Sequence, residues 1–107
     1  MKPLAKLKNI AEKLNVPYGI HQYTGESPEF CVYEIQEYEP ALFADNRAHA
    51  RIAHARLDYT LPANKSYDNL IWDISDMLVE AGFTDPVISV NHEEKYTTLQ
   101  FSSEIKA

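Results

Sequence analysis

The stretch LFADNRAHARIAHARLDYTLP, residues 42–62, decides the fold of this 107-residue chain because it fits two kinds of structure. As a helix, its alanines recur with Ile52 and Tyr59 at the three- and four-residue spacing of one face. As a strand, apolar and polar side chains alternate from Ala53 to Leu61, which is the period of a half-buried sheet. The alanine stripe has little to pack, and the alternation is the longest in the chain. We therefore predict irregular structure over 46–50 and a strand over about 51–61.

Two helices are predicted on either side of this strand. An apolar stripe from Leu4 to Leu14 indicates the first helix, and Pro17 should end it because proline disfavours helical geometry in the preceding residue. A second stripe runs from 67 to 81, with Ser66 as its expected N-cap. Gly82 stands where a left-handed C-terminal cap is expected, and Phe83 should pack back on the last turn.

The remaining segments favour strands. Residues 30–38, FCVYEIQEY, are rich in β-branched and aromatic side chains and should end at Pro40; a short strand around 19–23 can precede them. The segments VISVN and YTTLQFSSEI follow the second helix as two further strands. The sequence therefore predicts one α+β domain over residues 1–107, ordered helix, three strands, helix, two strands. Its sheet should be mainly antiparallel, of about four to five strands, with both helices packed on it.

Charge is unevenly distributed along the chain. The net charge is −6, yet residues 1–20 contain four lysines and one glutamate, so the other 87 residues carry −9. Residues 26–39 and 68–85 each hold five acids and no lysine or arginine. Such segments disfavour nucleic-acid binding, which depends on lysine and arginine at phosphates. One cysteine forms no internal disulfide, and no run approaches the ~20 apolar residues of a membrane span. We expect a soluble intracellular protein.

No catalytic, cofactor or metal site is predicted. On a strand, His49 and His54 have opposite parity and point to opposite faces, and His92 beside Glu93 and Glu94 lies in an expected hairpin turn. Cys31 lies within an apolar strand, where cysteine is usually a small buried side chain. The chain contains no nucleophile elbow and no phosphate-binding loop. An enzyme is therefore not expected.

Two features point to protein contacts. Trp72 and Val79 are seven residues apart, so they share a helix face that lies off the main apolar stripe. Either that stripe is wide and Trp72 packs on a loop, or Trp72 is an exposed anchor of the type enriched in interface hot spots. The seven tyrosines also suit a protein with extensive partner contacts.

Over about residues 30–105 the chain resembles the tail-terminator and tail-completion proteins of tailed bacteriophages and prophages, also described as minor tail or head–tail joining proteins. The resemblance rests on the order of elements, on Phe43–Ala44–Asp45 before the long strand, and on the Leu-x-x-Ala-Gly-Phe motif at Leu78–Phe83. It implies a structural protein that forms a ring, commonly of six copies, at the head-proximal end of the tail tube. Phe43 and Asp45, with Trp72 and Val79, are its candidate assembly residues.

The resemblance also implies a location and partners. The ring would assemble in the host cytoplasm, join the virion tail, contact the tail tube and head-completion proteins, and let DNA pass without sequence-specific binding. An acidic channel would keep the DNA from adhering, and its candidate lining is Glu26, Glu29, Glu34, Glu37 and Glu39. Two rivals stay open: a small monomeric adaptor that docks a host partner through the Trp72 face, and a small enzyme that uses the histidines.

Overall fold

The computed structural model describes the backbone of residues 2–44 and 47–107 and the side chains of residues 2–41 and 50–107. The chain forms one α+β domain in the predicted order of elements. These are α1 (Pro3–Lys13), β1 (Tyr18–Ile20), β2 (Phe30–Ala44), β3 (Arg47–Pro62), α2 (Asp68–Glu80), β4 (Val87–His92) and β5 (Tyr96–Lys106). Within the stretch that fits two kinds of structure, residues 47–62 thus form a strand, and the predicted fold class is confirmed.

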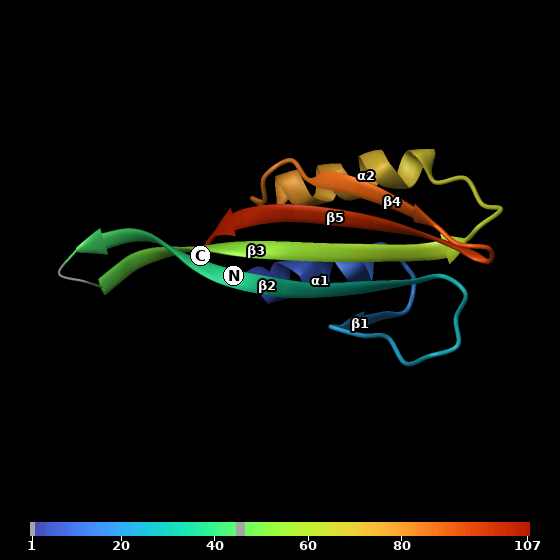
Figure 1. Cartoon of the computed structure of the whole chain (residues 1–107), viewed down its shortest axis with the longest axis horizontal. Helices are drawn as coiled ribbons and strands as arrows, with labels where there is room; N and C mark the ends of the chain where they lie inside the picture. The colour runs from blue at the N-terminus through green and yellow to red at the C-terminus, as the bar shows by residue number, and fades with distance from the viewer. Residues whose placement is uncertain (1, 45–46) are drawn as a thin grey trace.

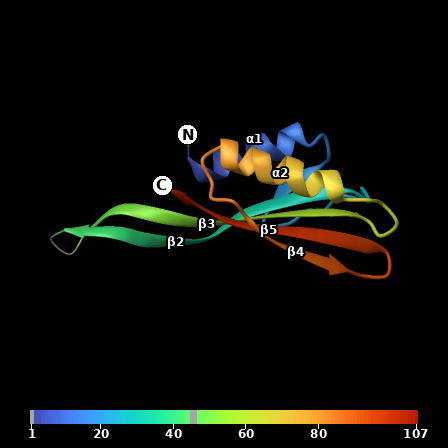
Figure 2. The same ribbon diagram turned by 90° about the horizontal axis from the view of Figure 1, so that it is seen from above.

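The five strands form one sheet in the order β1-β2-β3-β5-β4. β1 runs parallel to β2, and the other three pairs are antiparallel. Both helices lie on the same face of this sheet and leave the other face uncovered (Figures 1 and 2). The molecule therefore has a helical layer, a core and an open sheet surface.

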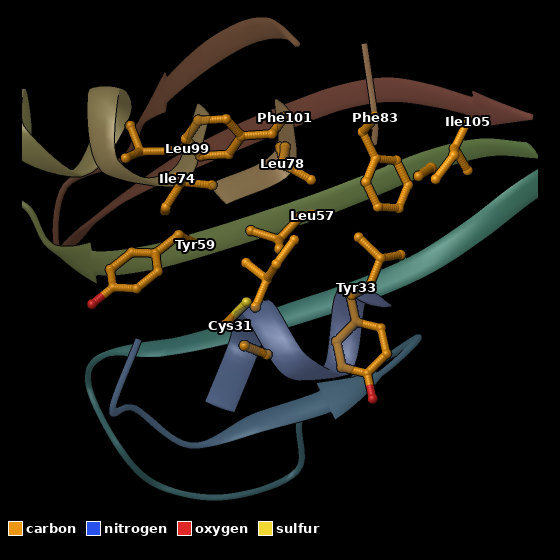
Figure 3. Close-up of a cluster of buried hydrophobic side chains, with 14 of the residues drawn as sticks. Cys31, Tyr33, Leu57, Tyr59, Ile74, Leu78, Phe83, Leu99, Phe101 and Ile105 are labelled. Atoms are coloured by element: carbon orange, nitrogen blue, oxygen red, sulfur yellow. The ribbon is translucent and has the colours of Figure 1, made fainter. Parts of the chain in front are cut away.

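The core lies between the sheet and the two helices (Figure 3). The apolar side chains that alternate along β3 are all buried, as a half-buried strand requires: Ala53, Ala55, Leu57, Tyr59 and Leu61. Leu7 of α1 and Ile74 of α2 pack over them, and Phe101 of β5 lies beside Leu57 in the sheet. Burying apolar area at about 25 cal/mol per Å² is the main force that holds the helices on the sheet.

The end of α1 differs from the sequence-based expectation. The helix has proline in its first turn, where the missing N–H costs nothing, and its last residue is Lys13. Asn15 adopts a left-handed conformation with φ of 58° and turns the chain two residues before Pro17. Asparagine tolerates this conformation better than most residues, so Asn15 and not Pro17 ends the helix.

The two ends of α2 follow different rules. Gly82 has φ of +101°, and the N–H of Phe83 donates to the carbonyl of Leu78 at 3.0 Å, which confirms the predicted C-terminal cap. The predicted N-cap is wrong, because Tyr67 and not Ser66 precedes the helix and no side chain caps it. The Tyr67 ring packs against the core, so tertiary packing outweighs local capping at this end.

β2 and β3 are both longer than predicted. β2 continues through Pro40 to Ala44, and β3 begins at Arg47, within the segment that was expected to be irregular. Proline is tolerated here for two reasons. β1 pairs with β2 only as far as Tyr33, so no described strand pairs with the outer edge of β2 at Pro40. On the inner edge, the pairing of β2 with β3 has register shifts close to Pro40, where a missing N–H disrupts little.

The extra length makes a projecting hairpin, here called the arm and comprising residues 40–44 and 47–51. Its two strands pair with each other and lie beyond the last residues of β1 and β5, apart from two main-chain hydrogen bonds between Arg51 and Ala107. Figure 1 shows the arm extending beyond both helices, and the molecule measures 54 × 26 × 23 Å. The arm makes this small domain markedly elongated.

Candidate assembly surfaces

The uncovered face of the sheet carries a group of carboxylates. This acidic row consists of Glu34, Glu37 and Glu39 of β2 and Glu104 of β5. Register places them: Glu34 is opposite Arg56, while Glu37 and Glu104 flank His54 on either side. Three of the five glutamates predicted to line a channel thus share one face. Glu104 was missed, because only the pairing of β5 with β3 brings it there.

A bulge in β2 puts these glutamates together. Ile35 is opposite Ala55, whereas Glu37 is opposite His54, so one residue, Gln36, is extra on the β2 side. With strict alternation, Glu37 and Glu39 would follow Ile35 onto the helix-covered face. The bulge reverses their direction and places them beside Glu34 on the open face.

His54 occupies the centre of the acidic row. Its Nε2 lies 2.8 Å from Oε2 of Glu39 and 4.0 Å from Oε1 of Glu37, and its Nδ1 lies 3.3 Å from Oε1 of Glu104. The hydrogen bond with Glu39 raises the pKa of His54 above its usual 6.5; desolvation opposes this, and the charges of Glu104 and Glu37 raise it further. When His54 is protonated, its imidazolium neutralises part of the row.

The same side chains include the ligand types of a metal site. Single donor atoms of Glu37, Glu39 and His54 lie within 4.8 Å of one another, the one such group of three in the described part of the chain. With bonds of about 2.0–2.2 Å, tetrahedral zinc ligands stand roughly 3.3–3.6 Å apart. The 2.8 Å contact between His54 and Glu39 is a direct hydrogen bond, too short to enclose an ion. The geometry favours a charge network, and the absence of a bound metal stays a prediction.

Glu26 and Glu29 lie apart from the acidic row, in the segment between β1 and β2. Glu26 is exposed. Glu29 accepts hydrogen bonds from Lys65, at 2.7 Å, and from the Tyr59 hydroxyl. Partial burial raises the pKa of Glu29, but these two hydrogen bonds and the lysine charge outweigh it and hold the pKa below its usual value. Glu29 thus fastens this segment to the body and is not a free surface charge.

A second surface lies between α2 and β4. Trp72 is 71% exposed and Val79 49%, so both side chains stand off the buried stripe of α2. They border a hollow of about 480 Å³, here called the α2–β4 groove, lined by Ile71, Trp72, Ser75, Asp76, Val79, Asp85, Pro86 and Ile88. Of the two interpretations of Trp72, the exposed position is the one observed. β4 is also an edge strand of the sheet, so its outer backbone faces the same region.

The other candidate assembly residues belong to the arm. The backbone of Phe43 lies in β2 and pairs with Ala48, while its side chain lies outside the described part of the structure. Asp45 lies wholly outside the described residues. The side chain of His49 is likewise not described, so its direction relative to His54 stays a prediction.

The histidine and cysteine positions weighed for catalysis have structural surroundings. Cys31 is fully buried, and burial together with the charge of Asp58 raises the pKa of its thiol to about 12, so the thiol is protonated and shielded at neutral pH. His92 Nδ1 lies 2.9 Å from the hydroxyl oxygen of Thr97, and its ring packs near Tyr67. Neither side chain combines an accessible nucleophile with a positioned base.

No protein-family profile matches this chain, and a comparison with curated proteins found no match. Among the described residues, neither helix has the length and apolar character needed to cross a membrane. The proposed function therefore rests on the arm, the acidic row and the α2–β4 groove.

Proposed function

We propose that this protein is a structural component of a phage or prophage tail that assembles into a ring at the head-proximal end of the tail tube. The observation that carries the proposal is the arm: a two-stranded projection of a small domain whose outer strand edges, among the described residues, pair with no other strand apart from the bonds between Arg51 and Ala107. Exposed strand edges pair readily with other chains, so a protein that keeps such an arm needs a partner for it. The tail-terminator resemblance of residues 30–105 supplies the class of assembly.

The acidic row gives the ring a way to pass DNA. Its carboxylates lie on one face that no helix covers, and the side chains of Glu37, Glu39 and Glu104 are 65%, 52% and 49% exposed. If that face lines the channel, phosphates meet like charges and do not adhere. In this arrangement the helices point outwards and His54 moderates the repulsion among neighbouring carboxylates.

A monomeric adaptor is the second candidate. The exposure of Trp72 favours it, since a tryptophan on an open helix face is a typical anchor for a single partner. In that case the arm would serve no assembly purpose, and the protein would bind one host protein with one-to-one stoichiometry.

Analytical ultracentrifugation over a wide concentration range, with and without purified tail tubes, separates these candidates. We expect a monomer at low concentration that forms a closed oligomer at high concentration or on the end of a tube, visible as a ring by electron microscopy. A protein that stays monomeric at millimolar concentration and never sediments with tail tubes would refute the ring and leave the adaptor.

A further inference from the structure

The α2–β4 groove combines two properties of a receptor for an extended peptide. It is an apolar hollow flanked by Trp72 and Val79, and it borders the outer edge of β4, which pairs only with β5 in the described part of the sheet. An extended segment that adds to such an edge gains main-chain hydrogen bonds, and alternate side chains enter the neighbouring hollow. The groove thus suits a strand better than a small molecule.

The arm has the properties of the matching ligand. Its β2 half, residues 40–44, reads PALFA, five consecutive apolar residues at the end of a strand, past the part that pairs with β1. Neither strand of the arm has a sheet neighbour on its outer side among the described residues, except for the bonds of Arg51 to Ala107. An extended apolar strand without a neighbour is a binding element or an aggregation site.

Charge is complementary between the two surfaces. From Asp68 to Asp85 the chain has five acids and no base, and Asp76 and Asp85 line the groove itself. The β3 half of the arm, residues 47–51, has two arginines and no acid, and Arg51 at the base of the arm is exposed. Opposite charges on donor and receptor steer their association and disfavour pairing of like surfaces.

We propose that the arm of one copy binds the α2–β4 groove of the next copy, extending its sheet at β4. Within one chain the arm extends away from the body that carries the groove (Figures 1 and 2), so the two surfaces meet between copies. A contact between two different surfaces is head-to-tail, and it closes into a ring when the rotation permits. The inference rests on the proposed ring function and assigns its interface.

Cysteine cross-linking tests this contact directly. Ala41→Cys marks the arm and Val79→Cys the groove; both positions are exposed. Mild oxidation of an equimolar mixture, at a concentration where the wild type associates, should give a cross-linked pair of chains. A chain that carries both substitutions should give a ladder of oligomers that ends at the size of the ring. The buried Cys31 is present in every variant, and unsubstituted protein controls for it.

Ala41→Cys mixed with Ser102→Cys is the matched control, because Ser102 is exposed on the open sheet face, opposite to the face on which α2 lies. If oligomers form but Ala41→Cys cross-links to Val79→Cys no better than to Ser102→Cys, the proposed interface is wrong and the ring function still stands. Absence of association at any concentration or on tail tubes would overturn both. Cross-linking of Val79→Cys to a different tail protein in place of the arm would assign the groove to that protein and also overturn the inference.

Charge reversal provides an independent readout. Arg51→Glu should lower the association constant about tenfold or more, and its combination with Asp76→Lys should recover most of that loss.

Trp72→Ala should lower the association constant by roughly 30-fold, while Ile20→Ala, an exposed apolar side chain on the opposite edge strand, should leave it unchanged. Equal losses in Trp72→Ala and Ile20→Ala, or no recovery in the charge pair, would contradict the proposed contact.

Discussion

His54 lies among carboxylates from two neighbouring strands, and its titration reports on the whole acidic row. Its hydrogen bond with Glu39 is the largest cause of its raised pKa. We expect the NMR titration of its ring protons to show a midpoint above 6.5, and Glu39→Gln to shift that midpoint down. Glu26→Gln, in an exposed position outside the row, is the control and should leave the midpoint in place.

The same shift gives His54 a pH-dependent contribution to stability. A group whose pKa is raised on folding stabilises the protein below its unfolded pKa, and loses that contribution as pH rises through its folded pKa. Stability from this network should therefore fall as pH rises above about 6.5, the usual histidine pKa. Urea unfolding of wild type and His54→Gln at several pH values measures it: the difference between the two proteins should be larger at pH 5.5 than at pH 8.5.

Leu57 tests the core at the scale of one side chain. It is 1% exposed and lies in the middle of β3, between the sheet and both helices (Figure 3). Leu57→Ala removes buried methyl groups and leaves a cavity, so we expect a loss of about 2–5 kcal/mol in the free energy of unfolding. Ser102→Ala, on the exposed face of β5, should change it by less than about 0.5 kcal/mol. Equal effects in urea denaturation would contradict the assigned faces of the sheet.

At the scale of elements, the cap of α2 shows how one glycine ends a helix. An added Cβ at Gly82 would meet Lys6 and Ile105 at ordinary contact distances, 3.4 and 3.5 Å, so the cost of substitution is conformational and not steric crowding. Gly82→Ala should therefore destabilise the domain by about 1–2 kcal/mol, the cost of a left-handed conformation for an L-residue. Thermal unfolding of Gly82→Ala beside Gly82→Asn checks this, since asparagine tolerates that conformation better and should lose less.

The arm should be the least protected part of the long strands. Its amides belong to a two-stranded ribbon, whereas β3 from Ile52 to Pro62 is hydrogen-bonded to both β2 and β5 over most of its length. Exchange requires only local opening in the arm but global unfolding in the centre of the sheet. Hydrogen exchange of the monomer should therefore be faster over 47–50 than over 53–60, and ring assembly should slow it in the arm. Equal protection in the monomer would show that the arm is held by contacts other than the ribbon.

At the scale of the whole molecule, the placement of the acidic row predicts how the assembled ring treats DNA. Replacing Glu37, Glu39 and Glu104 by lysine changes the net charge by six units and reverses the open face. Rings of this variant should bind double-stranded DNA at low salt and lose binding steeply as salt rises, whereas wild-type rings should not bind. The control carries the same charge change at exposed loop and turn positions, Glu26, Glu93 and Glu94. Equal DNA binding by both variants would show that the acidic row does not line the channel.

Local pattern alone determined most of the elements. Residues 53–61 form a strand because a two-residue period puts their five apolar side chains on one face. The apolar stripe of α2 has the helical period of about 3.6 residues and so forms a helix. Gly82 and Phe83 located the end of α2, since a left-handed residue is a property of a few neighbouring positions. The spacing of Trp72 and Val79 placed them off the buried stripe of α2, whereas the choice between a packed and an exposed Trp72 came only from the structure. In each case the interacting residues are close in the chain, so their spacing contains the information.

The lengths of β2 and β3 and the members of the acidic row depend on strand pairing, so only the tertiary structure decided them. Pro40 does not end β2, because among the described residues no strand pairs with the outer edge of β2 at that position, and pairing with β2 extends β3 back to Arg47. The bulge at Gln36 turns Glu37 and Glu39 to the open face, and the register of β5 brings Glu104 to His54. The members of the acidic row, Glu34 to Glu104, are up to 70 positions apart, and a one-residue change of register moves every side chain of a strand to the other face. No local spacing records that register, so the acidic row exists only in the folded sheet.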